Sequence, residues 1–153
     1  AAEVGIGVLI DMHGAVGSQN GQSHSGISDH HVGLFESQQN MDMTVACLEF
    51  LMRNLGQVTN VVGIQILNEP VDSPQLKDFY NRAISAMRAV AEWAAVFPLY
   101  IHDAFNLEEY SNFVSARDDW VIQDHHSYFV FTPKDTSESA SNHTQEVRTN
   151  IAN

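Results

Sequence analysis

Four short apolar stretches of the sequence are each followed directly by side chains that can exchange protons or form hydrogen bonds. They are residues 8–10 before Asp11 and His13, 61–67 before Asn68 and Glu69, 97–101 before His102 and Asp103, and 120–123 before Asp124, His125, His126 and Tyr128. A carboxyl group can act as an acid or a base, and amide, imidazole and phenol groups can bind hydroxyls or orient that carboxyl. The repetition favours one site assembled from several segments over four unrelated polar loops.

The apolar stretches themselves predict strands of a parallel sheet. They are short and rich in β-branched residues, which is typical of strands that are buried on both faces. Pro70 has no backbone donor, so it ends the second strand at Glu69.

Apolar residues recur at three- and four-residue spacings between these strands, which predicts helices. The predicted helices cover residues 41–55, 75–95 and 107–114, and a last one begins near Thr144. The alternation predicts an α/β fold with about four parallel strands and right-handed crossover helices. In such folds the carboxyl ends of the strands share one face, so the polar side chains that follow them are expected to converge.

The composition limits the classes of partner. The chain has 153 residues, enough for one domain, and a net charge of −12 with seven Lys and Arg residues. That charge argues against nucleic acid or a membrane as a partner and suits a neutral ligand.

Cys47 is the only cysteine, and we expect it to be a small core residue of the helix over 41–55. The glycine-rich segment 14–31 is expected to be a long irregular loop, and loops of that length are usually functional or disordered.

Four sequence motifs resemble one enzyme family. They are Ile-Asp-Met-His-Gly-Ala-Val-Gly-Ser-Gln-Asn-Gly (10–21), Gly-Ile-Gln-Ile-Leu-Asn-Glu-Pro (63–70), Ile-His-Asp-Ala-Phe (101–105) and Asp-His-His-Ser-Tyr (124–128). In this order they resemble the third to sixth strands of fungal exo-β-1,3-glucanases of glycoside hydrolase family 5. The resemblance implies a (β/α)8 TIM barrel, in which residues 1–153 are expected to be the central part of a single catalytic domain, incomplete at both ends. The nucleophile of the seventh strand and an Arg of the second strand would then lie outside this chain.

The resemblance also implies a role for each candidate residue. Glu69 is expected to be the catalytic acid/base, and Asn68 is expected to bind the sugar 2-hydroxyl. His13 and His126 are expected to bind substrate hydroxyls, and Tyr128 is expected to lie close to the nucleophile. The apolar strand behind Glu69 and a second carboxylate are expected to raise its pKa. No metal and no cofactor is expected.

The implied function is the retaining, exo-acting hydrolysis of β-1,3-glucan, which releases glucose in cell-wall metabolism. The implied partner is a β-glucan or oligosaccharide, the implied location is secreted or cell wall, and β-1,4- or β-1,6-glucan remains an alternative substrate. Because the nucleophile lies outside the chain, the isolated polypeptide is expected to be inactive and to need the rest of the barrel.

Two further hypotheses remain open. The chain could be an inactive remnant that binds carbohydrate, or a metal-dependent barrel hydrolase. The histidine pairs 30–31 and 125–126 give the second hypothesis little support, because adjacent residues of a strand point to opposite faces. For Trp120, Phe129 and Phe131, packing in the core is expected rather than stacking on a sugar.

Overall fold

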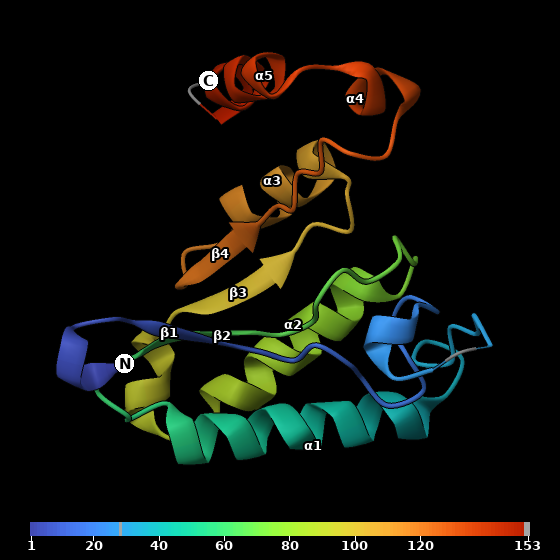
Figure 1. The fold of residues 1–153 in the computed structure, drawn as a ribbon. Helices are drawn as coiled ribbons and strands as arrows, with labels where there is room; N and C mark the ends of the chain where they lie inside the picture. Colours follow the sequence, from blue (N-terminus) through green and yellow to red (C-terminus); the bar gives the residue numbers. More distant parts are fainter. Residues whose placement is uncertain (28, 152–153) are drawn as a thin grey trace.

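The computed structural model describes residues 1–27 and 29–151 and shows one sheet of four parallel strands (Figure 1). The strands are β1 (Val8–Asp11), β2 (Val61–Gln65), β3 (Leu99–His102) and β4 (Val121–Asp124), which pair in the order of the chain. The helices are α1 (Gln38–Leu55), α2 (Leu76–Arg88), α3 (Leu107–Ser115), α4 (Pro133–Ser137) and α5 (Ala140–Ile151), with short 3₁₀ helices η1 (Ala2–Val4), η2 (Ser23–Ser25) and η3 (Glu92–Val96). The predicted α/β fold with parallel strands and crossover helices is confirmed, and the arrangement is compatible with part of a TIM barrel.

The core lies between one face of the sheet and helices α1 and α2, which pack side by side beneath β1 and β2 (Figure 1). Ile64 pairs with Leu99 and Leu99 with Val121, and all three side chains are buried. Their neighbours along the strands point the other way, so Leu9 and Ile122 on the opposite face are exposed. The sheet therefore has one covered face and one open face.

The second predicted helix is shorter than the sequence pattern suggested. The range 75–95 was expected to be one helix, but α2 ends at Arg88 and the separate helix η3 follows. Ala91 has an extended backbone, with φ −168° and ψ 165°, which interrupts the helix. The Arg88 guanidinium donates to the carbonyls of Ala94 and Phe97, so it stabilises the turn that leads into β3.

The ends of other helices follow local capping. Helix α1 begins at Gln38, three residues before the predicted start, because the Ser37 hydroxyl accepts a hydrogen bond from the Asn40 amide. Helix α4 was not predicted, although Thr132 and Asp135 form a reciprocal capping box around it. Helices α4 and α5 stand apart from the sheet, beyond α3 and β4 (Figure 1).

Cys47 is exposed on α1, so the expectation of a core cysteine was wrong. The buried face of this helix consists of Thr44, Val45, Leu48 and Met52. Cys47 is in the predicted helix but points away from that face. Among the described helices, none has the length and apolar character that crossing a membrane requires.

Candidate active site

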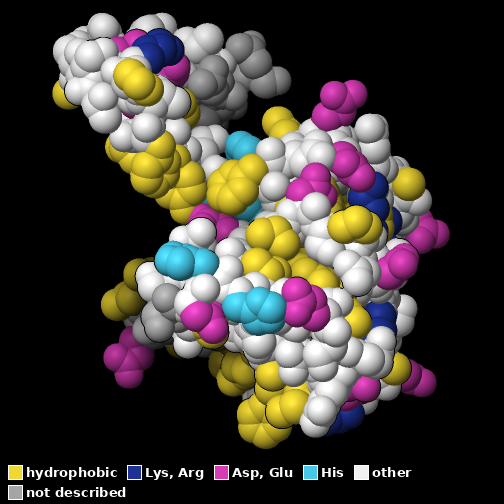
Figure 2. Space-filling model, turned by 90° about the vertical axis from the view of Figure 1, so that its right-hand side faces the viewer, with side chains coloured by type: hydrophobic (Ala, Val, Ile, Leu, Met, Phe, Trp, Pro, Cys, Tyr) yellow, Lys and Arg dark blue, Asp and Glu magenta, His cyan; other side chains and the backbone are white. Residues whose placement is uncertain are grey.

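The carboxyl ends of the strands surround a cavity of about 940 Å³. Figure 2 looks onto this face, where histidine and acidic side chains gather around an apolar hollow. The lining residues come from the segments after all four strands: Asn20, Gln22 and His24 after β1; Glu69, Pro70, Val71 and Asp72 after β2; Ala104 and Phe105 after β3; and His125, His126, Ser127, Tyr128, Phe129 and Phe131 after β4. Of the five candidate site residues, Glu69, His126 and Tyr128 line this cavity.

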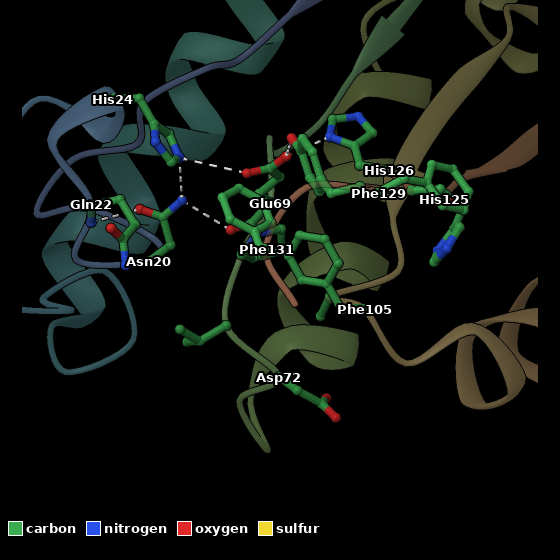
Figure 3. A pocket seen from close by; sticks show the side chains of 15 residues that line it. Asn20, Gln22, His24, Glu69, Asp72, Phe105, His125, His126, Phe129 and Phe131 are labelled. Carbon is green, nitrogen blue, oxygen red and sulfur yellow. Dashed lines mark hydrogen bonds and ion pairs between the residues drawn. The ribbon is translucent and has the colours of Figure 1, made fainter. Parts of the chain in front are cut away.

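Glu69 lies in the turn that follows β2, with its side chain 14% exposed. Its backbone is left-handed, with a φ of 43°, which is uncommon for a residue other than glycine and is typical of functional turns. The Asn20 amide donates to the Glu69 carbonyl over 2.9 Å, and this bond helps to hold the turn. The carboxylate therefore projects from a constrained backbone into the cavity (Figure 3).

One oxygen of the Glu69 carboxylate receives two donors. The Tyr128 hydroxyl donates to Oε1, and His126 Nδ1 lies 2.6 Å from the same atom. Burial raises the pKa of Glu69, but the hydrogen bonds from Tyr128 and His126 and the charge of His126 outweigh it, so the pKa is lowered. The expectation of a raised pKa was therefore wrong for this arrangement, because donors rather than a second carboxylate contact Glu69.

His126 connects Glu69 to a further acid. Its Nε2 lies 3.0 Å from Asp124 Oδ2, so each ring nitrogen faces a carboxylate. Both nitrogens can donate only in the protonated imidazole. Burial lowers the pKa of His126, but the hydrogen bond to Glu69 and the charge of Asp124 raise it by more. The contacts with Glu69 and Asp124 thus favour the protonated form of His126.

The loop after β1 supplies two residues that the sequence analysis did not identify, Asn20 and His24. Asn20 Oδ1 accepts from the Gln22 amide over 2.9 Å, which fixes the other amide atom, Nδ2, as a donor. Nδ2 then donates to the Glu69 carbonyl and to His24 Nε2, each over 2.9 Å (Figure 3). His24 Nε2 is therefore an acceptor, and it lies 3.7 Å from Glu69 Oε2. The expectation of a functional loop over 14–31 was the signal in the sequence that covers both residues.

Buried Gln19 fastens this loop to the turn that carries Glu69. Its side-chain amide donates to the carbonyls of His13 and Asn68 over 2.9 and 2.8 Å, and its Oε1 accepts from the Ala15 amide over 3.0 Å. Its own carbonyl accepts from the Val71 amide over 3.1 Å. Gln19 therefore connects the loop after β1 to the turn after β2 that carries Glu69.

The remaining candidates, His13 and Asn68, lie outside the cavity lining. His13 is half-exposed, with its Nδ1 2.7 Å from Asp11 Oδ2 and its ring 5.6 Å from that of His24. Asn68 is 5% exposed, and its side chain has no hydrogen bond to any residue that the structure describes. The Asn68 amide is therefore free to bind a ligand that reaches it.

The aromatic residues after β4 are not in the core. Phe129 and Phe131 line the cavity together with Phe105, and Phe131 is 78% exposed. Trp120 is 60% exposed and lies outside the cavity. The expectation that Trp120, Phe129 and Phe131 pack in the core was wrong. The segment that carries Phe129 and Phe131 leaves the sheet after β4 (Figure 1), and Trp120, the residue before β4, has an exposed side chain.

Glu69, His102 and His126 place one potential ligand atom each within 4.8 Å of the others, so we examined their fit to a metal ion. His102 Nδ1 accepts a hydrogen bond from the Ala104 amide over 3.0 Å, so its proton is on Nε2 and this nitrogen is a donor. Both ring nitrogens of His126 face carboxylates, and these contacts raise its pKa, which favours the form that cannot bind a metal ion. Because metal ligands must be deprotonated, the donor set suits a proton network rather than a metal ion.

Comparisons with curated proteins point to one group of enzymes. The chain is 36% identical over 135 residues to glucan 1,3-beta-glucosidase 3 of Schizosaccharomyces pombe, covering 86% of this chain and 28% of that protein. It is 33% identical to a glucan 1,3-beta-glucosidase of Kluyveromyces lactis, covering 94% of this chain and 35% of the relative. A sporulation-specific glucan 1,3-beta-glucosidase of Saccharomyces cerevisiae is 31% identical over 86% of the chain and 31% of that enzyme. The chain thus spans about a third of the length of these relatives. No protein-family model matches it.

Proposed function

We propose that this chain forms the central strands of the catalytic barrel of a retaining glycoside hydrolase that releases glucose from β-1,3-glucan. The observation that carries the proposal is Glu69, a carboxylate at the carboxyl end of a parallel strand, in a cavity to which all four strands contribute. The similar proteins are glucan 1,3-beta-glucosidases, which supports a β-1,3-linked glucan as the substrate class.

In the proposed reaction, Glu69 is the acid/base. It gives its proton to the glycosidic oxygen while a second carboxylate attacks the anomeric carbon, so the C1–O bond breaks and a glycosyl–enzyme ester forms. Glu69 then takes a proton from water, whose oxygen attacks C1 and displaces the second carboxylate. Two inversions return the β configuration. The second carboxylate belongs about 5–5.5 Å from Glu69 and is assigned to no residue of this chain.

The lowered pKa of Glu69 fits this proposal if Tyr128 changes partner. A second carboxylate near Tyr128 can accept the hydrogen bond from the Tyr128 hydroxyl. It also adds a negative charge beside Glu69. Both changes favour the protonated form of Glu69, because a like charge and a lost donor each raise the pKa of a carboxyl group. In the structure of this chain, the Tyr128 hydroxyl donates to Glu69 Oε1 instead.

Substrate contacts follow from the same assignment. We assign the unpaired amide of Asn68 to the sugar 2-hydroxyl, and His13 and His126 to other hydroxyl groups. The apolar side chains around the cavity suit the carbon faces of a neutral sugar. A glucan substrate places the enzyme at the cell wall or outside the cell.

The test is a chimera in which this chain replaces the aligned segment of the Schizosaccharomyces pombe relative. We expect the chimera to release glucose from a β-1,3-glucan, and Glu69→Gln to lower kcat by about 10²–10⁴-fold, because the variant cannot donate a proton. Glu36→Gln, which removes an exposed carboxylate outside the cavity, is the matched control. A correctly folded chimera that cleaves the glucan equally well with Gln at position 69 would show the assignment to be wrong.

A further inference from the structure

His102 is the last residue of β3, and its side chain is completely buried. Three contacts fix it in place. Its Nδ1 accepts the Ala104 amide over 3.0 Å, its carbonyl accepts the Tyr80 hydroxyl over 2.8 Å, and its ring stands edge-on to that of His126, 4.5 Å between centroids. The bond from Ala104 leaves only one neutral tautomer, with the proton on Nε2.

This Nε2–H has no hydrogen-bond partner among the described residues, although it is buried. The His102 ring belongs to a group with Glu69 and His126, in which each residue places one nitrogen or carboxylate oxygen within 4.8 Å of the others. Unpaired buried donors are rare in folded proteins, and each needs an explanation.

One oxygen of the Glu69 carboxylate lacks a hydrogen-bond donor among the described residues. Tyr128 and His126 both donate to Oε1. The nearest recorded group to Oε2 is His24 Nε2 at 3.7 Å, and this nitrogen is an acceptor because it receives the Asn20 amide. One carboxylate oxygen therefore has two donors, and the other has none among the residues that the structure describes.

We propose that the Glu69 carboxylate has a second position, in which it accepts a hydrogen bond from His102 Nε2–H, and that His102 is a positioning residue for the acid/base. The carboxylate takes this position when Tyr128 donates to another acceptor. The identity of that acceptor, a second carboxylate, rests on the proposed function; the pairing of Glu69 with His102 does not.

His102 is suited to this task because it remains a neutral donor. Burial lowers the pKa of His102, and the nearby charge of His126 lowers it further, while Asp103, Glu69 and Asp124 oppose these effects without reversing them. The contacts of His126 favour its charged form, whereas His102 supplies a donor with a fixed tautomer. The Glu69 carboxylate can then lose the hydrogen bond from Tyr128 and receive one from His102 in its place.

The test is a mutant cycle on the complete 153-residue chain, read out as the pKa of Glu69 by ¹³C NMR of its carboxyl carbon. His102→Asn retains an acceptor for the Ala104 amide but removes the Nε2 donor, whereas His102→Gln retains a donor near the Nε2 position. With Tyr128 present, we expect His102→Asn to change the Glu69 ionisation constant by less than about twofold. In the Tyr128→Phe background the same change should weaken the acid about tenfold, because an ionic hydrogen bond is lost, and His102→Gln should largely restore it.

An equal effect of His102→Asn in both backgrounds, or no effect in the Tyr128→Phe background, would overturn the proposal. If His102→Asn fails to fold, ¹⁵N-detected spectra of His102 in Tyr128→Phe alone decide the question. The Hε2 proton should then move downfield and exchange more slowly with water, and an unchanged signal would contradict the second position. No turnover is needed, so failure of this cycle leaves the proposed hydrolase function standing.

Discussion

At the scale of single residues, the site depends on how the two oxygens of Glu69 are supported. Tyr128 and His126 both donate to Oε1, and the resulting low pKa marks a stabilised carboxylate rather than a ready acid. Glu69, His126 and Tyr128 could be predicted from their positions after apolar strands and from the family motifs. The contributions of His24 and His102 could not, because they depend on which ring nitrogen carries the proton, which only the neighbouring amides fix.

The Glu69–His126 pair makes stability depend on pH. The folded-state pKa of Glu69 is below its ordinary value of 4.5, so its stabilising effect is complete above that value and is lost as the pH falls through the folded-state pKa. The pKa of His126 is above its ordinary 6.5, so its effect is complete below 6.5 and is lost as the pH rises through the folded-state pKa. Both contributions are therefore complete between 4.5 and 6.5.

We expect His126→Gln to reduce the free energy of unfolding more inside this window than at alkaline pH, where the wild-type imidazole is neutral. Urea unfolding at the two pH values measures the difference. His31→Gln is the matched control, because its pair with Glu36 is exposed on both sides and contributes little. An equal loss of stability at both pH values for His126→Gln would contradict the account.

At the scale of elements, strands and crossover helices could be predicted because each buries a regular apolar pattern. Their ends could not always be predicted. The interruption between α2 and η3 depends on Arg88 reaching the carbonyls of Ala94 and Phe97, which are six and nine residues ahead in the chain. The exposure of Phe131 depends on the course of the segment after β4, which no local pattern specifies.

The loop after β1 gives a prediction at this scale. Gln19→Ala removes three side-chain hydrogen bonds, to Ala15, His13 and Asn68, and leaves their backbone groups without that partner. We expect the free energy of unfolding to fall by about 1–3 kcal/mol, the cost of an unsatisfied buried polar group. Hydrogen exchange of the Val71 amide should also become faster.

Gln22→Ala, in the same loop but exposed, should change neither measurement by a comparable amount. If the two variants have equal stability and equal exchange at Val71, Gln19 does not fasten the loop to the turn that carries Glu69.

At the scale of the whole molecule, the proposed reaction needs a second carboxylate, which we assign to no residue that the structure describes. A retaining reaction needs a nucleophile in addition to the acid/base that we assign to Glu69. We expect the purified 153-residue chain to show no turnover of an aryl β-glucoside above that of its Glu69→Gln variant. Turnover that the substitution abolishes would show that a second catalytic group lies within this chain.

The most direct test of the acid/base role is chemical rescue of Glu69→Ala in the chimera described above. With an activated aryl β-glucoside, which needs no acid to leave, the variant should form the glycosyl–enzyme and then stall for lack of a base. Added azide should restore turnover and yield the β-glucosyl azide, because the anion attacks from the face that Glu69 had occupied. Formation of the α-glucosyl azide would make Glu69 the nucleophile, and the absence of rescue in a folded variant would remove it from the reaction.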